Sequence, residues 1–153
     1  MKPLLVLLSA FGLALAATWL LTGQLDYRLA GNVAMAVMLF FTGLAHVPYV
    51  RGMAQMLPAW LPAKNAWVYA TGLLEIVGGI GLLLPTWRPL AATCLLVFLV
   101  LILPANIISA RKHLDYQRGT LTGPGPRYLW FRVPLQLLFI GWTWYFGLHL
   151  AST

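Results

Sequence analysis

A single glutamate, Glu75, lies at the centre of a long run of apolar and small residues between Tyr69 and Pro85. A carboxylate in such surroundings is costly unless it is protonated or paired with a cation. Arg132 is the cation within a comparable apolar run that could pair with it. Ionisable residues in apolar segments of this length mark functional sites by default. The sequence leaves open whether Glu75 is held in a pair with Arg132 or exchanges a proton.

Three further polar residues, His46, Asn106 and Gln136, also lie within apolar runs. Because helical residues three and four apart share a face, each of these side chains can be assigned to a stripe of polar or small neighbours. The stripe around Glu75 holds Thr71, Gly72, Gly78 and Gly79, and the stripe around His46 holds Asn32, Met35, Leu39, Thr42 and Gly43. Small residues allow another helix to approach closely, so we expect both stripes to face the interior.

The depth of these residues predicts one shared pocket. With a rise of about 1.5 Å per residue, His46, Asn106 and Arg132 lie near one end of their helices, with Gln136 a turn deeper and Glu75 near the middle. We therefore expect a ligand-binding pocket formed by His46, Glu75, Asn106, Arg132 and Gln136. The alternative is that the neutral polar residues are interhelical hydrogen bonds and that Glu75 with Arg132 is a fixed buried pair, without chemistry.

The composition places these residues in a membrane protein. Of the 153 residues, 61% are hydrophobic and 8% are charged, whereas soluble domains carry about 25% charged residues. Each apolar run reaches roughly the 20 residues that cross a bilayer as a helix. The predicted fold is therefore an all-α, polytopic transmembrane helical bundle, a single domain over residues 1–153, with spans at about 3–22, 29–47, 65–84, 89–110 and 128–149.

The first of these runs has two interpretations. It has a basic start at Lys2, an apolar core and an Ala14-x-Ala16 pair, which is the pattern of a cleaved secretory signal peptide. The apolar run nevertheless continues through Trp19 and Leu21, so we expect it to be retained as a transmembrane helix.

The basic residues predict the orientation. With the N-terminus in the cytoplasm and the C-terminus outside, two of the ten basic residues, Arg28 and Arg88, lie on the outer side. Such a bias toward the cytoplasm is typical of multi-pass proteins. The net charge of +7 is then explained by topology and by anionic lipid, so we expect the bilayer as a partner and no nucleic acid.

The sequence offers little for autonomous catalysis. Cys94 is the one cysteine, which excludes an internal disulfide and a thiolate metal cluster. His46 is the one histidine in the inner half of a span, so no haem-binding histidine pair is expected, and no metal site is predicted. No nucleophile paired with a base and no cofactor fingerprint is visible, so no catalytic residue is assigned.

Two of the connecting segments are long enough to have structure of their own. Residues 48–64 mix methionine, leucine and tryptophan with three prolines, which predicts a short interfacial helix, although a gating role is an alternative. Residues 111–127 are basic and contain Gly-Pro-Gly-Pro, which predicts an irregular cytoplasmic loop.

The chain resembles the DoxX family of small bacterial membrane proteins from Leu29 to about Trp144. The matching pieces are FTGLAHVPYV, MLPAWLP, TGLLEIVGGIGLLLPTWRPLAA, LPANI and RVPLQLLFIGW. The resemblance implies a bacterial inner-membrane protein with a four-helix core, to which residues 3–22 add one N-terminal span. It also implies that His46, Glu75, Asn106, Arg132 and Gln136 belong to the family pattern, without settling a catalytic residue.

Members of that family look like a thiosulfate to quinone oxidoreductase subunit, membrane partners of thiol and superoxide defence enzymes, and, distantly, an animal receptor assembly factor. We therefore expect a small membrane subunit of a redox-linked complex that binds quinone or another amphiphilic ligand in the pocket. Its partner would be a membrane or peripheral redox protein, and the chain could form a homo-oligomer. The alternatives are a small proton-coupled transporter and a membrane-protein assembly or structural partner.

Overall fold

The computed structural model describes residues 2–115 and 117–151, and these residues are all-helical apart from loops and one isolated β-bridge between Asp115 and Thr120. The predicted all-α class is confirmed. The elements are α1 (Lys2–Thr22), α2 (Tyr27–Ala45), α3 (Val50–Ala54), α4 (Lys64–Leu83), α5 (Arg88–Leu101), α6 (Leu103–Arg111), the 3-10 turn η1 (Gly125–Tyr128), α7 (Leu129–Gly147) and the 3-10 turn η2 (His149–Ala151).

Four helical segments are long and apolar enough to cross a membrane: α1, α2, α4 and the continuous stretch from Arg88 to Arg111. They coincide with the first four predicted spans to within two residues at each end. The fifth predicted span is also a helix, α7, which has 19 residues. Helix α7, which carries Arg132 and Gln136, is not one of these candidate spans.

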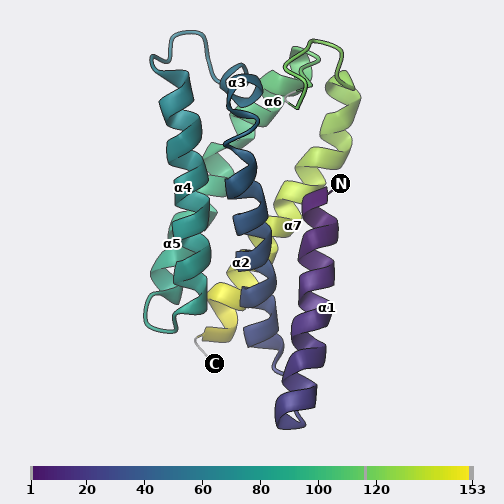
Figure 1. Ribbon diagram of the computed structural model, residues 1–153, viewed down its shortest axis with the longest axis vertical. Helices are drawn as coiled ribbons and strands as arrows, with labels where there is room; N and C mark the ends of the chain where they lie inside the picture. The colour runs from purple at the N-terminus through teal and green to yellow at the C-terminus, as the bar shows by residue number, and fades with distance from the viewer. Residues whose placement is uncertain (1, 116, 152–153) are drawn as a thin grey trace.

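Helix α2 is the centre of the bundle and packs against α1, α4 and α7, while α5 packs against α4 and α7 (Figure 1). One end of the bundle carries α3, the end of α6 and the segment 112–124, and we call it the loop end. The other end carries the short connections 23–26 and 84–87, and we call it the turn end. Helix α1 begins part-way along α2 and extends past the other helices at the turn end (Figure 1).

Helix α1 lies beside the other long helices rather than among them. It buries only Leu7 and Thr18. Phe11 contacts Trp142 of α7, with ring centroids 5.0 Å apart. The remaining apolar core is built by α2, α4, α5 and α7, with Met35, Leu39, Leu82, Leu95 and Phe139 among its buried side chains.

Helices α2 and α4 approach to backbone contact where two glycines face each other. A Cβ atom added to Gly43 would lie 2.8 Å from the carbonyl oxygen of Gly72, and one added to Gly72 would lie 2.8 Å from the Cβ of His46. Real Cβ atoms do not approach other atoms this closely, so only glycine fits at either position. The glycines around Glu75 therefore face other helices, as predicted: Gly72 and Gly79 face α2, and Gly78 faces Leu95 of α5.

The fourth predicted span is a helical stretch that is interrupted at one residue. The helix breaks at Ile102, between α5 and α6, two residues before Pro104. Proline lacks the backbone N–H that would bond the carbonyl four residues earlier, and its ring clashes with that carbonyl. Together α5 and α6 still form one candidate span, Arg88–Arg111, which agrees with the span predicted over 89–110, and α6 carries Asn106.

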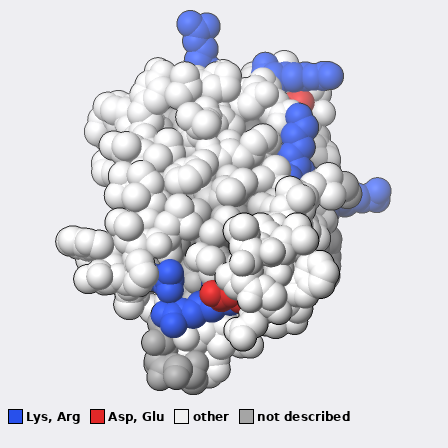
Figure 2. All heavy atoms as spheres, turned by 60° about the horizontal axis from the view of Figure 1, so that its bottom comes forward, with Lys and Arg blue, Asp and Glu red and all other residues white. Residues whose placement is uncertain are grey.

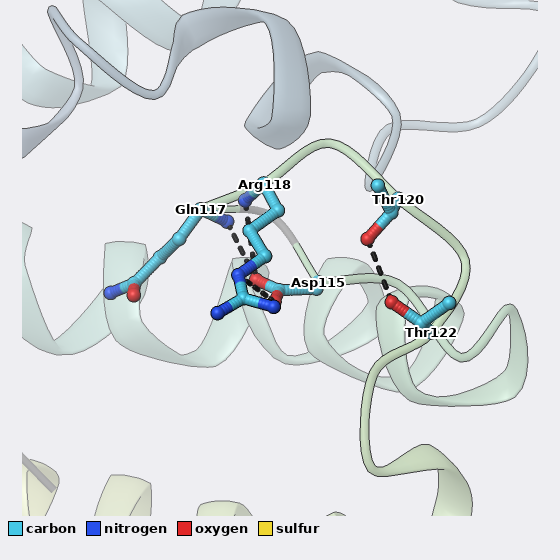
Figure 3. A network of polar contacts seen from close by, with 5 residues as sticks. All are labelled: Asp115, Gln117, Arg118, Thr120 and Thr122. Atoms are coloured by element: carbon cyan, nitrogen blue, oxygen red, sulfur yellow. Dashed lines mark hydrogen bonds and ion pairs between the residues drawn. The ribbon is translucent and has the colours of Figure 1, made fainter.

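The loop end is ordered by local hydrogen bonds. The short helix predicted within 48–64 is present as α3. In the following loop, Asp115 Oδ1 accepts hydrogen bonds from the backbone N–H groups of Gln117 (3.0 Å) and Arg118 (3.3 Å), as Figure 3 shows. Lys112 Nζ donates to the carbonyl of Gln55 (3.2 Å), which connects this loop to the segment after α3.

The glycine contact predicts a strong dependence on side-chain size. We expect Gly72→Ala to lower the free energy of unfolding by about 1 to 3 kcal/mol, because its new methyl group meets the Gly43 backbone. The measurement is reversible unfolding in mixed detergent micelles. Gly141→Ala is the matched control, since a Cβ there meets nothing within 4 Å. Equal stability of the two variants would contradict the close approach.

Candidate functional site

A cavity of about 250 Å³ lies in the part of the bundle toward the loop end. His46, Glu75, Asn106 and Arg132, four of the five predicted site residues, line it together. They come from the end of α2 and from α4, α6 and α7, so no single helix could form the site. The fifth predicted residue, Gln136, does not line the cavity but contacts Asn106.

The carboxyl group of Glu75 is buried, and the side chain is 7% exposed. Its Oε2 atom has no hydrogen-bond partner among the described residues. The Thr42 hydroxyl of α2 faces the same carboxyl group. No described basic side chain lies at ion-pair distance from it. Within the described residues, Glu75 is therefore a buried acid beside a hydroxyl group rather than half of an ion pair.

Arg132, which the sequence offered as the partner of Glu75, has other contacts. Its guanidinium lies over the ring of Tyr128, with Cζ 5.8 Å from the ring centroid. Such a contact between a cation and an aromatic face is favourable. Arg132 still lines the cavity, so its positive charge acts on whatever the cavity holds.

Asn106 and Gln136 form a buried pair beside the helix break. Asn106 Nδ2 donates to Gln136 Oε1 (2.7 Å), and Gln136 Nε2 donates to the carbonyl of Leu99, two residues before the end of α5. Gln136 therefore satisfies a backbone carbonyl next to the break and orients the Asn106 amide. Asn106 Oδ1 is buried and has no partner among the described residues, although it belongs to a residue on the cavity wall.

His46 is held by its own helix. Its Nδ1 atom lies 2.8 Å from the carbonyl oxygen of Thr42. Because a carbonyl only accepts, Nδ1 carries the hydrogen, and Nε2 then has the lone pair in the neutral ring. The ring is nearly fully buried and belongs to the cavity wall. It can therefore accept a hydrogen bond from a ligand through Nε2.

Most of the remaining wall is apolar and was not predicted from the sequence. Met53, Met56 and Leu57 belong to α3 and the residues after it, and Trp67 lies in the first turn of α4. The methionine spacing of three residues was a usable signal that α3 turns one face toward the interior. Lys2 also lines the cavity, because α1 begins part-way along the bundle. No residue spacing indicated that position, since it depends on how α1 docks.

The arrangement is suited to holding a polar group within an apolar cavity. Binding sites for small molecules are mostly apolar, with a few placed polar groups that fix orientation. Here the placed groups are the carboxyl of Glu75, the amide oxygen of Asn106 and the ring of His46. Two of them present buried oxygen atoms that lack a protein partner, a condition that costs free energy unless a ligand or water supplies a hydrogen bond.

The Asn106 to Gln136 hydrogen bond predicts coupled stabilities. We expect Asn106→Ala and Gln136→Leu to destabilise the protein individually and to show a coupling energy of about 0.6 to 1.7 kcal/mol in a double-mutant cycle. The cycle is measured by unfolding in detergent. Replacing Gln136 in an Asn65→Ala background is the control, because Asn65 is exposed. Additive effects of Asn106 and Gln136 would show that their contact carries no energy.

No curated protein and no solved structure matches the chain. Residues 35–147 match a family described as a domain of unknown function, DUF8561. The match covers most of α2 and all of α3 to α7, and it starts after α1, the helix beside the core. It includes all five predicted site residues, and the chain belongs to the DUF8561 family.

Proposed function

We propose that the protein is a multi-pass protein of the bacterial inner membrane, with α7 as its fifth span. Its outward faces are apolar, and side chains such as Leu21, Leu101 and Leu73 are 85%, 71% and 62% exposed. Its interior, in contrast, holds Asn32, Glu75, Gln136 and Thr143. Exposed apolar surface on this scale marks contact with a membrane or a partner. The resemblance to the DoxX family supports the bacterial membrane.

We place the loop end of the bundle in the cytoplasm. The basic residues of α3, α6 and the segment 112–127 gather there, together with Lys64 at the start of α4. Arg28 and Arg88 are at the turn end. A cytoplasmic excess of Lys and Arg is the usual determinant of orientation. Met1 and Thr153 lie outside the described residues. The side of the membrane on which each terminus lies is therefore inferred from the number of spans.

This orientation predicts opposite locations for the two ends of the chain. We expect a fluorescent reporter fused to the C-terminus to be dark and a periplasmic phosphatase fused there to be active. The N-terminal fusions should give the reverse result. Because five spans place the ends on opposite sides, reporters that place both ends on one side would contradict the proposal.

The function that the cavity supports best is binding of an amphiphilic ligand of the quinone class, as a small membrane subunit of a redox-linked complex. The observation that carries this proposal is the pair of buried oxygens, Glu75 Oε2 and Asn106 Oδ1, on residues that line an otherwise mostly apolar cavity. A quinol hydroxyl could donate to either oxygen. A quinone carbonyl could accept from a protonated Glu75.

The size of the cavity fits a ligand head rather than a whole lipid. Its volume of about 250 Å³ lies below the range of about 300–1,000 Å³ typical of drug-sized ligands. A tail would therefore extend beyond the cavity. Phe41, Met53, Met56 and Leu57 give the wall an apolar surface, and methionine adapts to irregular apolar partners.

Glu75 has a defined part in this proposal. Reduction of a quinone to a quinol takes up two electrons and two protons. The electrons would come from a membrane or peripheral redox protein, Glu75 would supply one proton to a ring oxygen, and solvent water would supply the second proton to the other ring oxygen. A buried carboxyl without a cationic partner avoids the cost of burial by staying protonated, so it is prepared to donate.

The ligand proposal predicts selective losses of affinity. We expect purified protein in detergent to bind decylubiquinone saturably, measured by isothermal titration, and Asn106→Ala to weaken binding about tenfold through loss of a hydrogen bond. Asn65→Ala, an exposed amide outside the cavity, should bind as the unaltered protein does. Glu75→Gln keeps the shape of the side chain and should bind the quinone but fail to complement a deletion strain.

Two results would overturn this proposal. The first is absence of saturable quinone binding together with full complementation by Glu75→Gln. The second is equal affinity of the Asn106→Ala and Asn65→Ala variants. Uptake of a solute by liposomes only under a pH gradient would instead indicate a transporter. Co-purification of one defined membrane protein without a bound ligand would indicate an assembly partner.

A further inference from the structure

Two arginines lie close together at the turn end, on the side of the bundle away from the cavity. Arg28 is in the first turn of α2, and Arg88 is the first residue of α5. Arg28 and Asp26 both lie within electrostatic range of Arg88. Figure 2, which turns this end toward the viewer, shows basic side chains gathered beside an acidic one.

The guanidinium of Arg88 is buried to an unusual degree for a residue in a short connection. Its side chain is 6% exposed. Arg88 Nε donates a hydrogen bond to the carbonyl of Leu82 (2.8 Å). Among the described residues, this is the hydrogen bond that the guanidinium group makes. An arginine has five donors, so most of its donors are left to other partners. Among the described residues no carboxylate lies at ion-pair distance from Arg88, and Asp26 acts on its charge only from farther away.

Arg28 shows the same deficit. Its Nε atom is buried and has no hydrogen-bond partner among the described residues. Asp26, the nearby acidic residue, uses Oδ1 to accept the backbone N–H of Leu29 (2.8 Å) as the N-cap of α2. The single negative charge of Asp26, which already caps α2, is therefore near the two positive charges of Arg28 and Arg88. The described part of this end therefore has an excess positive charge and unused donors.

We propose that Arg28 and Arg88 bind a phosphate group at the turn end. Arginine forks match the geometry of phosphate oxygens, and charge-assisted hydrogen bonds to them are strong. The helix starts of α2 and α5 add favourable partial positive charge. Both arginines lie at the ends of apolar helices, which is the level of phospholipid headgroups in a bilayer. The phosphate could belong to a lipid headgroup or to a free phosphoanion.

This site is independent of the proposed function. It uses no residue of the cavity and lies at the opposite end of the bundle. A failure of quinone binding would leave it untouched, and a failure of phosphate binding would leave the cavity proposal untouched.

The test uses the full chain purified in a detergent without phosphate. In one arm, isothermal titration measures the affinity for inorganic phosphate. In the other, native mass spectrometry compares retention of phosphatidylglycerol with retention of a galactosyl diacylglycerol that has the same acyl chains. The variants are Arg28→Gln and Arg88→Gln. Arg51→Gln is the matched control, because Arg51 is an exposed arginine of α3 at the loop end.

We expect the unaltered protein and the control to bind a phosphate group, and each of the two variants to lose affinity by at least about tenfold. Saturable binding of inorganic phosphate identifies a free phosphoanion. Selective retention of phosphatidylglycerol alone identifies a lipid headgroup. If Arg88→Gln does not fold, Arg88→Lys, which keeps the charge without the fork, and Arg28→Gln decide the matter. The proposal is overturned if neither probe binds or if Arg28→Gln binds as well as Arg51→Gln.

Discussion

The backbone contact between α2 and α4 at Gly43 and Gly72 determines where the polar groups of the bundle can lie. In the membrane that we propose, the hydrophobic effect would not hold the helices together, so close packing and interhelical hydrogen bonds would have to do so. The two glycines allow an approach that no side chain would permit. Glu75 lies one turn after Gly72 and faces the Thr42 hydroxyl one residue before Gly43. The feature that packs the helices thus also brings the acid and the hydroxyl group together.

Much of this arrangement could be predicted from the sequence, because the signals are local. The apolar runs predicted five helices whose observed ends differ by at most two residues, apart from the break at Ile102. The runs end at charged, proline or glycine residues that cannot continue an apolar helix. The stripe around Glu75 also faced the interior as predicted, since a run of small residues has little to offer lipid. His46, Glu75, Asn106 and Arg132 therefore meet at one cavity.

Other features depend on contacts between distant segments and had no local signal. Pro104 was visible, yet the apolar run continues through it, and hydropathy alone does not distinguish a broken helix from a straight one. The pairing of Gln136 with Asn106 and Leu99 follows from that break. The position of Lys2 on the cavity wall depends on where α1 docks. Arg88 follows the short connection 84–87, where a basic residue would be expected at the surface. Its burial depends on how α4 and α5 pack together.

The polar connections between α2 and α7 have a consequence for how the protein is made. Asn32 Nδ2 donates to the carbonyl of Phe146 (2.9 Å), and Trp142 Nε1 donates to the carbonyl of Gly31 (3.0 Å). Helix α2 therefore cannot complete its polar contacts until α7 is present. During synthesis the ribosome releases α2 more than 100 residues before its partner, because these contacts span 114 and 111 positions. The cavity also lacks the wall of α7 until then. In a nascent chain these groups of α2 therefore lack their partners in α7, and bundle closure is a step that follows translation of α7.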